Sequence, residues 1–230
     1  MIINKMLTTT NYNKGSGKQN KYIVIHYVGA TGGAEANCKY FKDVYRGASA
    51  HYFVGHEGEV WQCVEDGDIA WHCGAKVYRH PFCRNSNSIG VELCCRKAAN
   101  GSWYFEEATA KAAITLVKYL MNEYNIPVEN VIRHYDVTGK ICPEPYVRST
   151  EQWNGFKAYL KVNDSTPVNN GYLVVVTADE LNVRKGAGVG FPVVTSVKKG
   201  EVYTIVDECN GWGKLKSGVG WFNLKYTKRV

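Results

Sequence analysis

The chain has 230 residues, of which 45% are hydrophobic and 21% charged, a composition typical of folded globular proteins. This length suits one medium-sized domain and one small domain, and no apolar run approaches the length of a membrane span. The net charge of +7 favours polyanionic partners, but a nucleic acid is not the expected one, because the chain has no known nucleic-acid motif and no lysine-rich stripe interleaved with aromatics.

The N-terminal third begins with a polar segment and continues with a strand and a helix. Residues 1–20 are expected to form an irregular surface arm. They lack the apolar segment and the small-residue cleavage site of a signal peptide, so the sequence predicts synthesis in the cytoplasm. Residues 22–27, YIVIHY, predict a strand buried on both faces of a sheet. Apolar residues recur every three or four positions in residues 33–45, which predicts a helix.

The middle of the chain alternates between short strands and loops. Residues 50–54 and 60–64 predict the two strands of a hairpin. Residues 70–87 predict a long loop, and loops of this length are often functional. Residues 88–94 predict a strand that holds Glu92 on a rigid element.

Two helices and a short strand follow. Residues 106–124 carry the clearest apolar stripe in the chain and predict a helix. Residues 131–133 predict a short strand that delivers His134 to the edge of the sheet, and residues 150–161 predict a last helix.

The composition changes after residue 162, so we expect a domain to end there. Residues 163–171 are polar and contain proline, serine, asparagine and glycine, which predicts a linker. Residues 172–230 contain short runs rich in valine and threonine, separated by glycine turns. This pattern predicts a small all-β domain.

The eight cysteines are irregularly spaced. Disulfide frameworks are typical of small secreted domains, whereas a chain of this length can bury a core of its own. We therefore expect reduced thiols, most of them buried, in agreement with synthesis in the cytoplasm.

Two histidines and one cysteine suggest a metal site. His26 ends the run YIVIHY, while His134 and Cys142 begin and end HYDVTGKIC. Two imidazoles and a thiolate form a zinc set with three protein ligands and a fourth position open for water, which is the catalytic arrangement. Taken alone, each residue has a structural explanation, as a packed core histidine or a small buried cysteine. Lys140 beside Cys142, and Glu92 in NSIGVEL, strengthen the zinc interpretation.

The segments around these residues resemble the zinc-dependent N-acetylmuramoyl-L-alanine amidases, the type 2 family that shares its fold with the peptidoglycan recognition proteins. The matching segments are YIVIHY (22–27), SAHYFVGHEGEVWQC (49–63), AWHCG (70–74), NSNSIGVEL (85–93) and RHYDVTGKICP (133–143). The resemblance implies an α/β domain over residues 1–162, with a mixed central sheet flanked by helices. It also implies one Zn²⁺ ion, held by His26, His134 and Cys142.

The same resemblance ties two further residues to catalysis. Glu92 is expected to act as general base and acid, although a glutamate can also be a surface or ion-paired residue. Lys140 is expected to stabilise the oxyanion, although most loop lysines are simply solvated. Some family members carry a tyrosine before the histidine of SAHYF, where this chain has Ala50. Glu92 is the candidate for the proton-handling role of that tyrosine.

Substrate contacts are expected from the long loop and the segment that follows it. Trp71, His72 and Asn87 are the candidates, and anchoring of the loop is the alternative role for Trp71. His51 is expected to be a core histidine. The zinc ion is not assigned to any of His51, His56, His72 or His80.

Residues 173–228 resemble the bacterial SH3-like modules of cell-wall hydrolases. The segments LNVR-x-G, KKG, NGW and GW carry this resemblance. It implies a small SH3-like barrel that docks on peptidoglycan. An aromatic groove is expected from Tyr172, Trp212, Trp221 and Tyr226, although small barrels also use aromatic side chains in their cores.

Together these resemblances predict an endolysin or autolysin that lyses the bacterial cell wall. Its reaction would be the hydrolysis, by zinc-activated water, of the amide bond between N-acetylmuramic acid and L-alanine of the stem peptide. The alternatives are a non-catalytic peptidoglycan-binding protein and a nucleic-acid-binding protein. Retention of Cys142 argues against the first alternative, and only the net charge supports the second.

Overall fold

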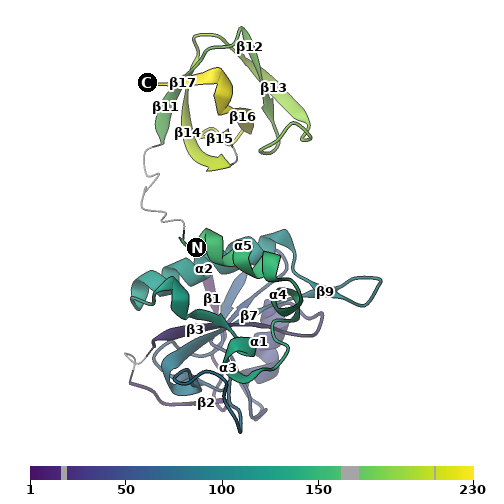
Figure 1. Ribbon diagram of the computed structural model, residues 1–230, viewed down its shortest axis with the longest axis vertical. Helices are drawn as coiled ribbons and strands as arrows, with labels where there is room; N and C mark the ends of the chain where they lie inside the picture. Colours follow the sequence, from purple (N-terminus) through teal and green to yellow (C-terminus); the bar gives the residue numbers. More distant parts are fainter. Residues whose placement is uncertain (17–19, 162–170, 210) are drawn as a thin grey trace. The chain divides into compact units, whose positions relative to one another are not determined.

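The computed structural model describes four segments of the chain, residues 1–16, 20–161, 171–209 and 211–230. The described chain divides into two compact units, Met1–Val162 and Asn163–Val230 (Figure 1). Residues 163–170 of the expected linker lie outside the described residues.

The first unit is built on a mixed sheet of six strands. Their order is β1 (Ile3–Lys5), β5 (Val60–Gln62), β4 (Tyr52–Val54), β7 (Ser88–Leu93), β3 (Tyr22–Tyr27) and β10 (Val131–Arg133). Only β4 and β5 pair antiparallel, because a short hairpin joins them, and the other neighbours pair parallel. The adjacent strands β7 and β3 lie inside the sheet, between β4 and the edge strand β10, and are almost fully buried.

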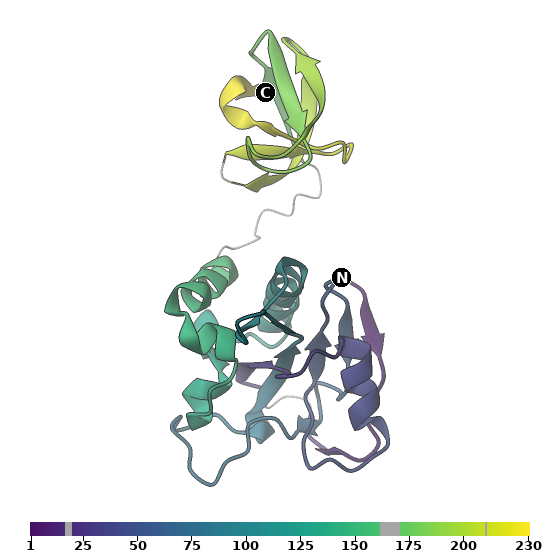
Figure 2. The same cartoon turned by 90° about the vertical axis from the view of Figure 1, so that its right-hand side faces the viewer.

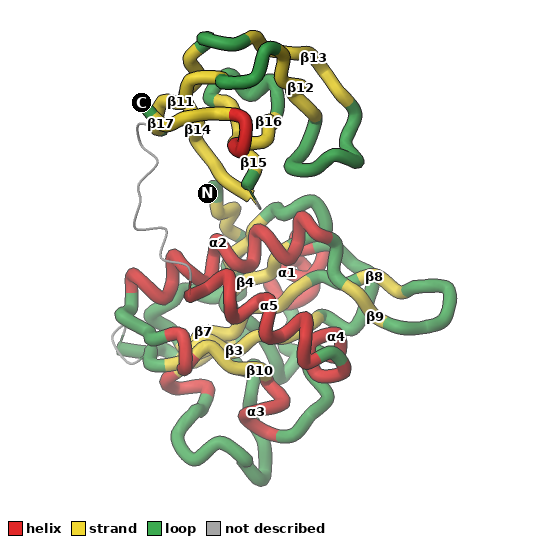
Figure 3. The backbone as a smooth tube through the Cα atoms, turned by 45° about the horizontal axis from the view of Figure 1, so that its top comes forward, coloured by secondary structure: helices red, strands yellow, loops and turns green. Residues whose placement is uncertain are grey.

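Helices cover both faces of this sheet, as expected. The helices are α1 (Ala34–Lys42), α2 (Glu107–Glu123), α3 (His134–Thr138), α4 (Glu144–Arg148) and α5 (Thr150–Lys161). Figure 1 shows α2 and α5 on one side of the sheet and α1 and α3 on the other. Figure 3 shows α2 and α5 side by side over the strands, and α1 lies beside β4 and β5 (Figure 2).

The largest core lies beneath α2 and α5. Leu116, Val117 and Leu120 of α2 are completely buried, as the predicted apolar stripe requires. They pack with alternate residues of the central strands, such as Ile23 and Ile25 of β3. Burial of each such aliphatic side chain stabilises the folded state by about 1.5–3 kcal/mol relative to leaving it exposed. This core makes β3 a rigid support for residues on its other face.

The N-terminal segment differs from the expected irregular arm. Its strand β1 pairs with β5, and β2 (Tyr12–Asn13) pairs with β6 (Ile69–Ala70). The prediction was wrong because strands at a sheet edge pair through backbone groups, and these leave no apolar pattern in the sequence. A further small hairpin joins β8 (Arg96–Lys97) to β9 (Trp103–Tyr104).

Seven cysteines belong to the described side chains, and all seven are buried free thiols, as expected. Among the described residues, no helix has the length and apolar character required to cross a membrane.

The second unit is an all-β sheet of seven strands, as predicted. In sheet order they are β13 (Val193–Lys198), β12 (Glu180–Arg184), β16 (Trp221–Asn223), β15 (Trp212–Leu215), β14 (Val202–Cys209), β11 (Tyr172–Val176) and β17 (Thr227–Arg229). Every pair is antiparallel. Inward-facing residues of several strands, such as Val183, Ile205 and Phe222, form a core that belongs to this unit alone.

Candidate metal centre

The central strands place His26 and Glu92 side by side. Successive side chains of a strand point to opposite faces of the sheet. Because Ile23 and Ile25 point into the core beneath α2 and α5, His26 points to the opposite face. His26 is also directly opposite Glu92 in the parallel pairing of β3 with β7. The sheet register therefore brings an imidazole and a carboxylate together on one face.

The segment after β10 brings His134 next to Cys142. The backbone N–H of Arg133 donates to Asp136 Oδ2 at 2.8 Å, and this bond caps α3 at the residue before His134. At the other end of α3, Gly139 adopts a left-handed conformation with φ of 86°, which favours glycine and reverses the chain. The backbone N–H of Tyr135 then donates to the carbonyl of Cys142 at 2.8 Å. This turn holds the sulfur close to the imidazole.

The ligand atoms of His26, His134 and Cys142 all lie within 4.8 Å of one another. The three residues are 1%, 6% and 3% exposed. Cys142 Sγ lies 3.7 Å from His26 Nδ1, and the two imidazole centroids are 4.7 Å apart. Residues separated by more than a hundred positions in the sequence therefore form one compact donor cluster.

The protonation states of this cluster suit a soft divalent cation. Burial lowers the pKa of His134 to about 4 and that of His26 well below its usual value, so both rings are neutral at pH 7. Burial, followed by the nearby Glu92, raises the pKa of the Cys142 thiol, so a thiolate here requires a cation to stabilise it. Two nitrogens and one sulfur are ligands that zinc prefers. The donor set therefore fits zinc.

Glu92 lies at the edge of this cluster. Its Oε1 is 3.9 Å from His26 Nδ1, and because His26 is neutral this contact is not an ion pair. Its Oε2 is buried and has no hydrogen-bond partner among the described residues. Burial raises the pKa of Glu92 to about 7, which is suitable for a group that accepts and returns a proton near neutral pH.

A cavity of about 500 Å³ opens beside the cluster. Its lining residues are Gly47, Ala48, Trp71, His72, Gly74, Ala75, Asn85, His134, Thr138 and Lys140. Three of the sequence candidates, Trp71, His72 and Lys140, thus lie along the same cavity as the candidate ligand His134. The side chain of Lys140 is exposed in this lining.

The structure does not bring Asn87 to this cavity. The side chain of Asn87 accepts a hydrogen bond from the Arg84 backbone and donates one to the Phe82 carbonyl, within the 3₁₀ turn η1 (Asn85–Asn87). Asn85 lies in the lining instead, where its Oδ1 accepts from the backbone N–H groups of His72 and Cys73. Asn85 and Asn87 are the same residue type in the same short segment, so the sequence alone does not indicate which of them lines the cavity.

The other buried histidines form hydrogen bonds with the backbone outside the cluster. His51 Nδ1 accepts from the N–H of Gly90 at 3.0 Å, and His51 Nε2 lies 3.2 Å from the Asp68 carbonyl. His56 Nε2 lies 3.2 Å from the carbonyl of Thr31. His72 differs from both because it contacts the ligand His26 directly.

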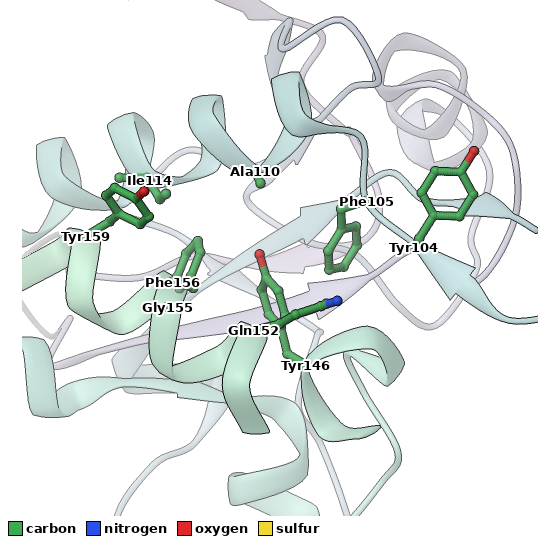
Figure 4. Close-up of a pocket in the computed structure, with 9 residues that line it drawn as sticks. All are labelled: Tyr104, Phe105, Ala110, Ile114, Tyr146, Gln152, Gly155, Phe156 and Tyr159. Carbon is green, nitrogen blue, oxygen red and sulfur yellow. The ribbon is translucent and has the colours of Figure 1, made fainter. Parts of the chain in front are cut away.

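A second pocket in this unit, of about 290 Å³, lies between α2 and α5. Its lining residues are Tyr104, Phe105, Ala110, Ile114, Tyr146, Gln152, Gly155, Phe156 and Tyr159 (Figure 4). It shares no lining residue with the cavity beside the metal cluster.

In the second unit, the four candidate aromatics do not form one groove. Trp212 and Tyr226 line a pocket of about 260 Å³ together with polar residues that include Glu180 and Arg184. Tyr172 does not line this pocket; Arg229 covers its ring at 3.8 Å, and its hydroxyl bonds to Glu208. Trp221 is likewise absent from the lining, and the ammonium of Lys214 lies 5.9 Å from its ring centre.

Comparison with known protein families yields one match for each unit. A family described as N-acetylmuramoyl-L-alanine amidase matches residues 16–145, which is more than half of the chain. A family described as bacterial SH3 domain matches residues 179–228.

Individual relatives point to the same family. The chain is 32% identical over 167 residues to a probable N-acetylmuramoyl-L-alanine amidase of Bacillus licheniformis, an alignment that covers 68% of this chain and 46% of that protein. It is 33% identical over 148 residues to the amidase CwlL of the same species, covering 60% of this chain and 39% of CwlL. The chain thus spans less than half the length of either relative.

Solved structures resemble the first unit. PlyL matches with a TM-score of 0.59 and 28% identity, covering 70% of this chain and 98% of PlyL. The catalytic domain of XlyA matches with a TM-score of 0.56 and 26% identity, covering 70% of this chain and 99% of that domain. These matches confirm the predicted mixed α/β fold.

Proposed function

We propose, since the chain belongs to the N-acetylmuramoyl-L-alanine amidase family, that it hydrolyses the amide bond between N-acetylmuramic acid and L-alanine of the stem peptide in bacterial peptidoglycan. Water is added across this bond, so the lactyl group gains a carboxylate and L-alanine gains a free amino terminus. The observation that carries the proposal is the buried cluster of two imidazoles and one thiol beside an open cavity.

The proposed metal ligands are His26, His134 and Cys142, whose donor atoms lie within 4.8 Å of one another. Zinc bound by them would supply a Lewis acid, which makes water acidic near neutral pH and polarises the substrate carbonyl. The ligands come from β3 and from the two ends of the α3 turn. The pairing of β10 with β3 and the cap of α3 support this proposal, because they would hold the three ligands in place before a metal binds.

Glu92 is the proposed general base and acid. Its carboxylate lies beside the donor cluster, and its Oε2 has no other described partner. It would accept a proton from the attacking water and return that proton to the departing amine nitrogen. Ala50 replaces the tyrosine that some relatives carry, and Ala50 has no group that can transfer a proton. Glu92 would therefore serve both proton transfers.

Lys140 is the proposed oxyanion stabiliser. It lies in the lining of the same cavity as His134, and its backbone carbonyl accepts the N–H of Cys142 at 2.7 Å. The ammonium would donate a hydrogen bond to the substrate carbonyl oxygen as negative charge develops there.

Residues 1–162 are proposed to be the catalytic domain and residues 172–230 the wall-binding domain. The second unit has its own core and matches the bacterial SH3 family. Docking of this unit on peptidoglycan would raise the local concentration of the catalytic unit at its substrate. The site of action would accordingly be the bacterial cell wall.

Digestion of purified cell wall tests this proposal. New L-alanine amino termini should appear, activity should disappear with a chelator, and added Zn²⁺ should restore it. Cys142→Ser should bind the wall but release no amino termini. New reducing sugars without new amino termini would identify a glycosidase instead, and wall binding without any cleavage would leave only a recognition protein.

A further inference from the structure

A line of hydrogen bonds leads away from the metal cluster into the protein. His26 Nε2 lies 3.0 Å from His72 Nδ1, and His72 Nε2 lies 3.2 Å from Ser88 Oγ. The hydroxyl of Ser88 donates to the carbonyl of Arg84 at 2.6 Å. His26, His72 and Ser88 are all buried, so these bonds are shielded from water.

The acceptor at the end of this line sets the direction of every bond. The Arg84 carbonyl can only accept, so the Ser88 hydroxyl uses its proton there and accepts at its oxygen from His72 Nε2–H. The backbone carbonyl of Ser88, 3.4 Å from His72 Nε2, also requires a proton on that nitrogen. With its proton on Nε2, His72 accepts at Nδ1 from Nε2–H of His26.

This direction leaves His26 with a lone pair on Nδ1. That nitrogen faces the cluster, since it lies 3.7 Å from Cys142 Sγ and 3.9 Å from Glu92 Oε1. The hydrogen-bond line therefore selects the tautomer of His26 whose Nδ1 is able to bind a cation.

The backbone around His72 is built to hold its ring. A Cβ atom at Gly90 would come within 2.5 Å of the His72 Cγ atom, so only glycine leaves room for the imidazole on this face of β7. The backbone N–H groups of His72 and its neighbour Cys73 both donate to Asn85 Oδ1, at 3.2 and 2.8 Å. Both the backbone and the ring of His72 are thus restrained.

We propose that His72 is a positioning residue for His26, which orients the ring and selects the tautomer that binds the metal through Nδ1. This inference rests on the proposed metal centre and extends it to a residue that contacts a proposed ligand. It also changes the role expected for His72, because both of its ring nitrogens are already bonded within the protein and are not available to a substrate. Such supporting bonds commonly change metal affinity by about 10- to 100-fold.

Two substitutions separate the hydrogen bond from the bulk of the ring. His72→Phe fills the space but offers no acceptor, and it should weaken Zn²⁺ affinity about 10- to 100-fold in competition with a chromophoric chelator. His72→Asn places a side-chain oxygen near the former Nδ1, and it should recover most of that loss. The matched control is His56→Phe, which replaces a buried histidine that bonds to the Thr31 carbonyl instead, and it should leave Zn²⁺ affinity unchanged.

Nitrogen-15 spectra of the imidazoles give a direct readout in the metal-free protein. In the wild type, His26 should carry its proton on Nε2, and in His72→Phe this preference should be lost. Ser88→Ala, which keeps both rings, should weaken the preference of His72 for a proton on Nε2. Thermal unfolding of each variant shows whether the fold is retained, and the wild-type spectrum requires no variant at all.

The outcomes distinguish this inference from the proposed function. A protonated Nδ1 on His26 in the wild type, or equal affinity losses in His72→Phe and His72→Asn, would overturn the positioning role. Failure of the wild-type protein to bind Zn²⁺ at all would refute the metal centre instead, while the spectra would still decide the tautomer of His26.

Discussion

Burial determines the chemistry of the residues in the candidate metal centre. The sheet removes the side chains of His26 and Cys142 from water, so the ring stays neutral and the thiol resists ionisation unless a cation is present. Glu92 keeps a buried carboxylate oxygen without a described partner, which costs about 1–3 kcal/mol. Unsatisfied groups of this kind are expected where they serve catalysis.

Replacing Glu92 by glutamine tests its role in proton transfer. Glutamine keeps the shape but cannot accept the proton, so kcat should fall about 10²- to 10⁴-fold. Zinc content should remain at the wild-type level, because Glu92 is not a proposed ligand. Glu151→Gln, at an exposed position of α5, is the matched control and should retain full activity. Activity of Glu92→Gln within about tenfold of wild type would remove the residue from the mechanism.

Replacing Lys140 by methionine tests oxyanion stabilisation. The loss of a single donor to the developing charge should lower kcat about 10²- to 10³-fold, and KM should change far less. Lys140→Arg should retain part of the activity because it keeps a positively charged donor. Lys39→Met on α1 removes an exposed lysine from another surface and controls for net charge. Equal kinetics for Lys140→Met and Lys39→Met would contradict the role.

At the scale of elements, α5 supports the strand that precedes the proposed metal ligand His134. The ammonium of Lys157 in α5 donates to the carbonyls of Val128 and Val131, which belong to the 3₁₀ turn η2 (Val128–Asn130) and to β10. His134 directly follows β10. Burial lowers the pKa of Lys157 to about 8. This helix therefore fixes the edge strand through a partly buried amine.

The lowered pKa of Lys157 predicts a pH-dependent contribution to stability. Between pH 8 and 10.5 the unfolded chain binds more protons at Lys157 than the folded chain, so this residue should increase the free energy of unfolding as the pH rises. The free energy of unfolding of the wild type minus that of Lys157→Met should therefore increase across this window and stay constant below it. Urea unfolding at several pH values measures this difference.

The control for this experiment is Lys39→Met, at an exposed position of α1. Its difference from wild type should show no trend across the window. If the free energy of unfolding of the wild type minus that of Lys157→Met decreases as the pH rises, then burial of the ammonium is not the dominant effect in the folded protein.

At the scale of the whole molecule, the two units have separate cores. The core beneath α2 and α5 contains only residues of the first unit, and the core around Val183 and Phe222 contains only residues of the second. Neither core contains a side chain from the other unit, so the contributions of the two units to function can be tested separately.

Removing the second unit tests its proposed docking role. A protein of residues 1–162 should fold and should cleave soluble peptidoglycan fragments at the rate of the full chain. Its apparent affinity for insoluble cell wall should fall by about 10²-fold or more, because the linked binding site is lost. Equal wall affinity of the short and full proteins would show that the second unit has another function.

Two tyrosines of the second unit provide a matched pair. Tyr226→Ala removes a residue that lines the pocket with Trp212, and it should weaken sedimentation of the isolated unit with cell wall. Tyr172→Ala removes a ring that Arg229 covers, and it should leave wall binding unchanged. The reverse ranking would place the wall-binding surface around Tyr172.

Local patterns in the sequence determined most of the elements and the type of site. The run at 22–27 and the apolar stripe at 106–124 are periodic over their whole lengths, and each forms the expected element as β3 and α2. The resemblance to the amidase family, carried by several short segments, named the same three side chains that the structure brings within 4.8 Å. The two elements can be predicted because neighbouring residues encode them.

Only the tertiary structure decided which distant groups meet. It turned the polar segment at 1–20 into edge strands, placed Asn85 rather than Asn87 in the cavity and separated Tyr172 from Tyr226. It also joined His72 to His26 across 46 positions. These outcomes depend on backbone pairing, register and ring orientation between segments far apart in the chain. The free energy of such contacts arises only when the segments pack, so no local pattern records them.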